Sequence, residues 1–322
     1  MCLKKSFLKL CVSGLLFFPL FANAGGNVDE ILAGLKSEDP FTRCKTMASI
    51  KITPELDQRI IAEVINSLAD SHEKVQTAAG TTLIKMKGLA VPTLVKVLDE
   101  TNTFVSYEDE GKKIALKVRV VYVLKGIGSV NAVPALIKSL QGYDDLKKAS
   151  VSALSALGPR AAAAVPALGK LIEGNGTPSE VYDLLRALIE IGPASVPELI
   201  RLLENRPWPG EYGEGRMNYP GMGKDLIIAL GMIGAKAKNA VPILIPLLEN
   251  EHEEIRQATV RALGDIGSSA KDSIPALKQA LDDKNPDIRI AAAEALKKIG
   301  VVESKKMKEV SNDAKERKAA GF

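Results

Sequence analysis

The sequence predicts an all-α protein built as a stack of similar two-helix units rather than as one compact domain. A Val-Pro or Ile-Pro pair recurs along the chain, and counting along the sequence puts successive prolines 31 to 45 residues apart. A period of 31 to 33 residues, lengthened twice, is typical of a repeat architecture. These prolines are Pro92, Pro134, Pro166, Pro197, Pro242 and Pro275. Between them, a glycine closes each apolar run, at Gly88, Gly128, Gly158, Gly192, Gly234, Gly267 and Gly300.

These markers predict two helices in each unit. Proline suits the first turn of a first helix, where its missing N–H needs no partner, and glycine suits a left-handed residue just past the end of a second helix. The second residue after each proline is Leu and the sixth is Leu or Ile, which gives the first helix one apolar face. The second helix has its own stripe, as in Ile255, Ala258, Ala262 and Leu263, and again in Ile288, Ala291, Ala295 and Leu296. A single pair cannot bury both faces, so we expect the units to stack.

The first 24 residues have the pattern of a secretory signal peptide. Three lysines precede an apolar run at 10–21, and Ala22-Asn23-Ala24 forms an A-x-A cleavage site. A run of about twelve residues is too short for a transmembrane helix of roughly 20 residues. We therefore expect residues 25–301 to form the solenoid of a periplasmic or secreted protein, with no membrane span after cleavage.

Charge and cysteine content narrow the function classes. Loss of the three lysines of the signal segment lowers the net charge from +4 to +1, which argues against nucleic-acid binding. Cys44 is then the one cysteine left, so the mature chain has no internal disulfide. A structural thiol is favoured over a reactive one, which would need exposure and a lowered pKa.

Two units are longer than the others. The extra residues, at about 100–113 and 205–223, lie between the first and second helices, so both insertions should emerge at the same edge of the stack. They hold five of the ten aromatic residues outside the signal segment: Phe104, Tyr107, Trp208, Tyr212 and Tyr219. Such side chains serve as interface anchors or stack on sugars. Alternatively, they fold back to anchor the loops themselves.

Residues 248–267 and 281–300 resemble HEAT repeats of the short variety named after phycobilisome lyases, in the armadillo-type class of helical folds. The resemblance covers about eight units between residues 28 and 300, the first two degenerate. It implies a right-handed α-solenoid with first helices on the convex side and second helices on the concave side, and a function in binding other macromolecules. It also implies that a basic residue near the start of the second helix pairs with backbone or acids of adjacent units. These residues are Arg43, Lys117, Lys147, Arg256 and Arg289.

The concave side is a second candidate surface. The second helices would present there a mixture of charged, polar and aromatic side chains, which fits a protein or peptide partner. A solvated helix face is the alternative explanation of the charges. The residues are Lys148, Tyr182, Arg186, Lys224, Gln257, Arg261 and Glu294. The charged tail at 302–322 is expected to be a frayed helix, a disordered end or a cap on the last repeat.

Two enzyme hypotheses are disfavoured. Deoxyhypusine hydroxylase is built from similar repeats and binds iron through His-Glu pairs, and this chain has His72-Glu73 and His252-Glu253. Both pairs precede the arginine position, in the turn that enters the helix, and they belong to units two and seven, so we expect no metal site. The second hypothesis is a chromophore lyase like the phycobilisome proteins that share the repeat, but that chemistry implies a cytoplasmic setting, whereas the signal segment predicts export. The sequence contains no G-x-S-x-G motif, P-loop or His-Cys arrangement.

The sequence therefore predicts a non-enzymatic, exported scaffold for a protein or peptide partner, without a cofactor. The alternative is a carbohydrate or cell-wall binding module that uses the aromatic insertions.

Overall fold

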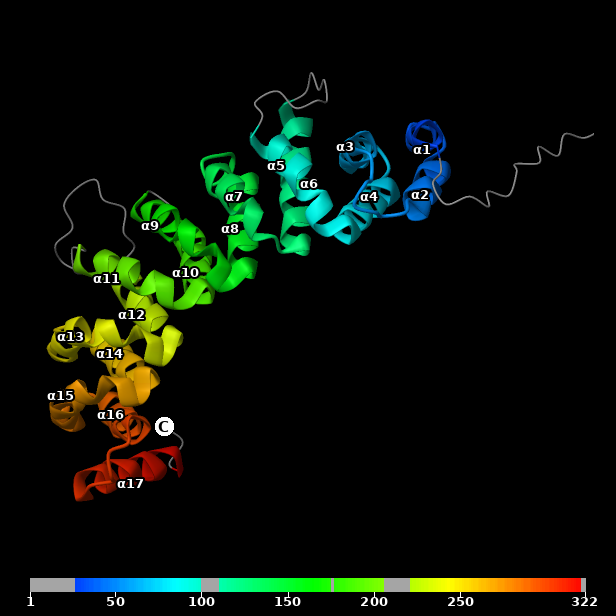
Figure 1. Cartoon of the computed structure of the whole chain (residues 1–322). Coiled ribbons are helices and arrows are strands. Elements are labelled where there is room, and N and C mark those ends of the chain that lie inside the picture. Colours follow the sequence, from blue (N-terminus) through cyan, green and yellow to red (C-terminus); the bar gives the residue numbers. More distant parts are fainter. Residues whose placement is uncertain (1–26, 100–109, 175–176, 206–220, 320–322) are drawn as a thin grey trace, which may run out of the picture.

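The computed structural model describes residues 27–99, 110–174, 177–205 and 221–319. These residues form helices joined by turns, without a β-strand. Figure 1 shows the helix pairs following one another along an arc, with the first helix of each pair outside and the second inside. The described residues thus form an α-solenoid of eight helix pairs, as predicted.

The pairs follow the predicted register of first and second helices. In chain order they are α1 (Val28–Leu35) with α2 (Pro40–Ser49), α3 (Gln58–Asn66) with α4 (Glu73–Met86), α5 (Val91–Asp99) with α6 (Glu110–Ile127), α7 (Val133–Ser139) with α8 (Asp144–Leu157), α9 (Val165–Glu173) with α10 (Pro178–Ile191), α11 (Val196–Glu204) with α12 (Met222–Ile233), α13 (Val241–Leu244) with α14 (Glu253–Ile266), and α15 (Ile274–Gln279) with α16 (Pro286–Ile299).

Short 3₁₀ helices complete the units. Those that end first helices are η1 (Ser67–Ala69), η7 (Ile245–Glu249) and η9 (Ala280–Asp282). Those that join one unit to the next are η2 (Lys87–Leu89), η3 (Val130–Ala132), η4 (Gly158–Ala164), η5 (Gly192–Ser195), η6 (Gly234–Ala240) and η8 (Gly267–Ser273).

The predicted apolar stripes form the core. Both Leu/Ile positions after each proline are buried in all six first helices, from Leu94 and Leu98 to Leu277 and Leu281. The small residues of the second helices allow close contact between them. A Cβ atom added at Gly231 would lie 2.8 Å from Cα of Ala262, in the next second helix. Gly264 faces Ala295 in the same way, so any larger residue at either glycine would push two second helices apart.

The residue that closes each second helix differs in detail from the prediction. Gly158, Gly192, Gly234 and Gly267 have a positive φ, but their ψ values lie between −130° and −145°, whereas Gly300 adopts the left-handed helical conformation. In the second unit the positive φ falls on Lys87 (φ 50°, ψ −126°) rather than on Gly88. A side chain therefore occupies a backbone conformation that suits glycine.

Several predicted boundaries change. Helix α6 begins at Glu110 and α12 at Met222, so the last residues of both predicted insertions are helical. Residues 305–319 of the tail form α17 (Lys305–Ala319), which packs on α16 and buries Met307 and Val310. Of the three structures expected for the tail, the helical cap on the last repeat is the one observed.

Two segments have the length and hydropathy of membrane spans, Asp144–Glu173 and Met222–Glu249. Neither is one continuous helix. Each comprises the second helix of one unit, a turn with a positive-φ glycine (Gly158 or Gly234) and the first helix of the next unit. Their apolar side chains supply core residues of the solenoid, such as Leu154 and Leu230.

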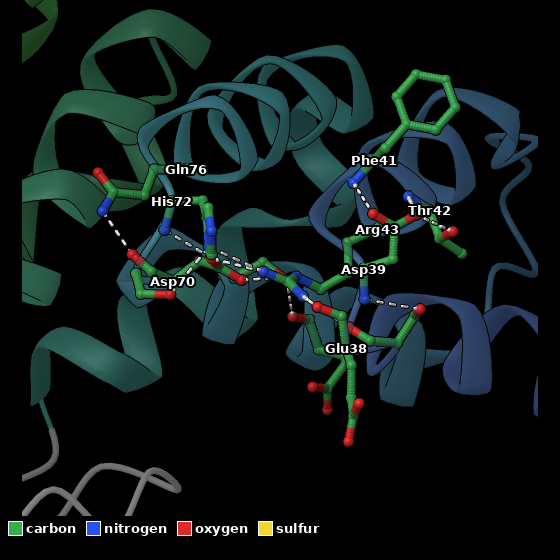
Figure 2. Close-up of polar contacts among 12 residues, drawn as sticks. Glu38, Asp39, Phe41, Thr42, Arg43, Asp70, His72 and Gln76 are labelled. Atoms are coloured by element: carbon green, nitrogen blue, oxygen red, sulfur yellow. Dashed lines mark hydrogen bonds and ion pairs between the residues drawn. The ribbon is translucent and has the colours of Figure 1, made fainter.

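An arginine clamp ties one turn to the next at two places in the chain. Arg43 donates from Nη1 to the carbonyl oxygens of Ser37 and Glu38, while its Nε and Nη2 lie 2.8 and 2.9 Å from the carboxylate of Asp70, one unit later (Figure 2). Asp70 also accepts the N–H of His72 at the start of α4. One guanidinium thus holds two successive turns.

The same clamp recurs near the other end of the chain. Arg256 binds the carbonyls of Asn250 and Glu251 and forms a bidentate pair with Asp283. The two side chains of that pair are only 7% and 9% exposed. Burial alone would raise the pKa of Asp283, but hydrogen bonds from Arg256 and from the Asn285 N–H hold it below the usual aspartate value.

Each of the other three basic residues has a contact within its own unit. Arg289 donates to the carbonyls of Asp283 and Lys284, and Lys117 donates to that of Leu98. Lys147 pairs with Asp144 on its own helix, so for Lys147 the predicted contact with an adjacent unit is wrong. The flexible lysine side chain satisfies its charge locally because it lacks the planar fork that reaches both turns.

We predict that Lys87→Gly stabilises the protein by about 1 kcal/mol. The strain of a non-glycine residue at this φ and ψ, roughly 1–3 kcal/mol, exceeds the entropic cost of glycine, roughly 0.5–1 kcal/mol. Chemical denaturation measures the difference. Gly88→Ala is the control and should change little, because an added Cβ meets no atom within 4 Å. A less stable Lys87→Gly protein would contradict the assignment of strain.

Arg256→Ala should destabilise the protein by about 3 kcal/mol, because it leaves a buried carboxylate without its partner. The matched control is Arg186→Ala, which removes an exposed ion pair with Asp183 and should cost under about 1 kcal/mol. Equal losses in urea denaturation would show that the clamp contributes no more than a surface pair.

The clamp also predicts a dependence of stability on pH. The pKa values of Asp70 and Asp283 are lowered in the folded protein, so their contribution is complete above the unfolded value near 3.8 and is lost as the pH falls toward the folded values. Asp283→Asn should therefore be less stable than the parent at pH 7, and the gap in denaturation free energy should narrow below about pH 4. A gap that stays constant from pH 7 to pH 3 would refute this linkage.

Candidate functional site

The concave surface is formed by one narrow strip of each second helix. Its remaining sides are covered by the first helix of the same unit and by the second helices before and after it. The strip centres on the residue six positions before the one that closes the helix. Counted this way through α4, α6, α8, α10, α12, α14 and α16, the central residues are Thr81, Tyr122, Ser152, Arg186, Ile228, Arg261 and Glu294, all exposed except the half-buried Ser152.

All seven residues of the predicted concave set are described, and each lies six or ten positions before the residue that closes its helix. Lys148 on α8 and Tyr182 on α10 are exposed, and Tyr182 shares the face of Arg186, four residues on. Lys224 on α12 is half-buried and forms a 3.2 Å ion pair with Glu254 on α14. Lys224 and Arg261 line a cleft between α12 and α14, which is described below, and Lys148 does not line it.

The aromatic residues of the insertions cannot be placed in this way. Phe104, Tyr107, Trp208, Tyr212 and Tyr219 lie outside the described residues. One insertion follows α5 and precedes α6, and the other follows α11 and precedes α12. Both therefore fall between a first and a second helix, as the sequence predicts.

Sequence reasoning missed several apolar side chains on the same strip. Tyr122 is 54% exposed, Met232 64% and Ile228 41%, all on second helices. Tyr122 and Ile228 occupy the central position, and Met232 lies one turn after Ile228. Counting positions back from the closing glycines finds all three, whereas a pattern of aromatic clusters and charges does not include them.

A cleft of about 210 Å³ opens on the concave side between α12 and α14. One wall comprises Lys224, Ile228 and Met232, which recur every four residues along α12. The facing residues of α14 are Glu254, Gln257, Ala258, Arg261, Ala262 and Asp265. The cleft is therefore a groove between two parallel stripes of the solenoid's inner layer.

The two histidines occupy the turns expected from the sequence. His72 and His252 are the residues directly before α4 and α14, in the second and seventh pairs. His72 lies within the first arginine clamp, where Nδ1 is 3.4 Å from Asp70 (Figure 2). Within the described ranges, no three His, Cys, Asp or Glu side chains lie together as metal ligands. Cys44, on α2, is half-buried.

The titratable groups with shifted pKa values belong to caps and ion pairs. A hydrogen bond from the Thr42 hydroxyl lowers the pKa of Asp39 at the start of α2, and the Thr177 N–H lowers that of Glu180 in a capping box on α10. The pKa of Arg201, on the outer helix α11, is raised by Glu198 and Glu173. These groups stabilise helix ends and turns, and none lines the groove between α12 and α14.

Comparison with known proteins supports the repeat assignment. A family model described as HEAT repeats matches residues 224–297 and 241–319. No curated protein is significantly similar in sequence. The solved structure of Kap121p is similar over 88% of this chain and 34% of its own, with 15% identity and a TM-score of 0.53. The chain thus spans about a third of Kap121p.

Two solved enzymes also resemble the chain. The complex of CpcE and CpcF of phycocyanin lyase from Nostoc sp. PCC7120 is 20% identical, with coverage of 81% of this chain and 95% of the lyase chain and a TM-score of 0.35. Human deoxyhypusine hydroxylase is 18% identical, with coverage of 84% and 95% and a TM-score of 0.33. At these scores neither likeness carries a functional argument. The helix pairs make the described part of the chain an α-solenoid, and its residues 224–319 match the HEAT-repeat family model.

Proposed function

We propose that this protein is a non-enzymatic scaffold that binds a protein or peptide partner along its concave face. The observation that carries the proposal is the chemistry of the strip left uncovered on the second helices. Large apolar side chains stand exposed there beside arginine and lysine. Of the ten large apolar side chains that the described residues expose, four lie on this strip: Tyr122, Tyr182, Ile228 and Met232.

This composition suits a protein partner. Tyr, Met and Arg are enriched in protein interfaces, because they combine contact area with polar or charged groups. Exposed apolar residues are ordinary when scattered singly, but here they recur on neighbouring helices of one face. The strip also mixes both signs of charge, for example Arg186 beside Asp183, unlike the basic stripe of a nucleic-acid binder.

We also propose that the partner lies outside the cytoplasm. The signal pattern of residues 1–24 supports this location. A mature N-terminus at Gly25, found by mass spectrometry of the exported fraction, is the expected result. An intact N-terminus in the cytoplasmic fraction would contradict it.

Glycan binding is the second candidate, and it rests on the aromatic insertions. Trp208 and Tyr212 would stack on sugar rings, so binding should survive high salt and fall with Trp208→Ala alone. A protein partner would instead respond to changes on the second helices.

Affinity capture from the exported fraction of native cells tests the scaffold. We expect the mature chain to retain a partner, and Tyr122→Ser with Tyr182→Ser to lose most of it, because two exposed aromatic anchors are removed. A second variant replaces residues 206–220 by a Gly-Ser linker, and Lys278→Glu on the outer helix α15 is the surface control. Circular dichroism must show that all four proteins are folded.

The outcomes separate the two surfaces. Loss only in the tyrosine variant supports the concave face, and loss only in the linker variant moves the site to the aromatic insertions. Equal retention by all variants, or no captured protein at all, would contradict a concave protein-binding site.

A further inference from the structure

The groove between α12 and α14 combines an apolar interior with charged ends. Its floor is formed by Ala258 and Ala262, which are 6% and 2% exposed, and one wall by the side chains of Ile228 and Met232. These two residues remain 41% and 64% exposed, although each is flanked by packed helices. An apolar side chain placed between them would remove their exposed carbon surface from water.

The size of the groove selects its occupant. Its volume of about 210 Å³ exceeds a cavity of roughly 150 Å³ that holds benzene. It is smaller than the pockets of roughly 300–1,000 Å³ that enclose cofactors and other small molecules. One side chain of the size of Leu, Met or Phe fits, and a larger ligand would have to lie mostly outside.

The charges around the groove favour an acidic neighbour for that side chain. Lys224 is neutralised by Glu254 at 3.2 Å, and Asp265 by Lys298 of the next unit at 2.8 Å. Arg261 lies on the rim between these pairs and has no hydrogen-bond or ion-pair partner among the described residues. The groove therefore offers one uncompensated guanidinium, whose planar fork matches a carboxylate.

We propose that this groove anchors a partner peptide that carries a large apolar residue next to an acidic one. The apolar side chain enters between Ile228 and Met232, and the carboxylate binds Arg261. This inference rests on the proposed function, since it names the chemistry of a segment recognised by the same concave face. Arg261 fixes the sign of the partner's charge, and the apolar groove fixes the size of its anchor.

Selection from a library of random twelve-residue peptides displayed on phage tests the proposal, with the full mature chain as bait. We expect the peptides enriched by the parent to share Leu, Met or Phe within two residues of Asp or Glu. With the Arg261→Glu variant as bait, the enriched peptides should carry Lys or Arg in place of the acidic residue, since the variant reverses the one unpaired charge of the groove. Met232→Ser should weaken the apolar preference, and Lys278→Glu on α15 is the charge-matched control.

The affinity of one synthetic peptide for the parent and for each variant then measures how much each substitution weakens binding. A peptide enriched by the parent should bind Arg261→Glu about tenfold or more weakly, and its Glu→Lys counterpart should recover binding to that variant, in line with about 1.4 kcal/mol for each tenfold change. All variants change exposed residues, and circular dichroism must show that they fold.

Three results would overturn the proposal. Enriched peptides that respond to Tyr182→Ser but not to Arg261→Glu or Met232→Ser would keep the concave scaffold and place its anchor elsewhere. A dimer in analytical ultracentrifugation that Met232→Ser dissociates would assign the groove to a second copy of this chain. Failure to enrich any peptide, alongside a captured native partner, would reject a short acidic anchor while leaving the scaffold intact.

Discussion

The structure depends on one packing constraint, which is that a two-helix unit can bury its apolar faces only against its neighbours. The second helices meet at their smallest residues, as where Gly231 faces Ala262 and Gly264 faces Ala295. The first helices bury larger side chains, Leu and Ile, such as Leu199 and Leu244. An inner layer packed through glycine and alanine is shorter than an outer layer packed through leucine, so we attribute the curvature in Figure 1 to this difference.

The arginine clamp adds direction to this stacking. Arg43 and Arg256 each bind the backbone of their own turn and the carboxylate of the following turn, and they do so near opposite ends of the solenoid. Polar groups at the turns are thus satisfied by the chain itself. The strip on the second helices is different, because packing uses every other side of those helices and leaves Tyr122, Tyr182 and Met232 facing solvent. This strip is therefore the surface on which the proposed partner would bind.

Much of the fold could be predicted from the sequence because its signals are local and repeated. Pro92 and the later prolines mark helix starts, and Leu94 and Leu98 show the buried face from spacing alone. Exceptions arise where neighbouring residues compete for one role. Lys87 takes the positive φ expected of Gly88, and Lys147 pairs within its own helix instead of bridging two units. Neither outcome is visible in the repeat pattern, since both depend on where a turn closes in space.

The candidate site could be predicted only in part. Charged and aromatic residues on the second helices, such as Tyr182 and Arg261, were expected on the concave side. The groove was not expected, because it depends on the separation of α12 from α14 and on ion pairs formed by Lys224 and Asp265 across units. Ile228 and Met232 resemble core residues in a sequence rich in buried Ile and Leu, and only their register shows that they face outward.

Site-specific photo-crosslinking in native cells tests whether the concave strip is the binding surface, whichever protein is bound there. A benzophenone amino acid would replace Tyr122, Tyr182 or Met232 on the inner helices, and Lys138 or Lys278 on the outer helices α7 and α15. We expect a discrete crosslinked protein from the three inner positions and none from the two outer ones. Adducts from the outer positions alone would contradict it.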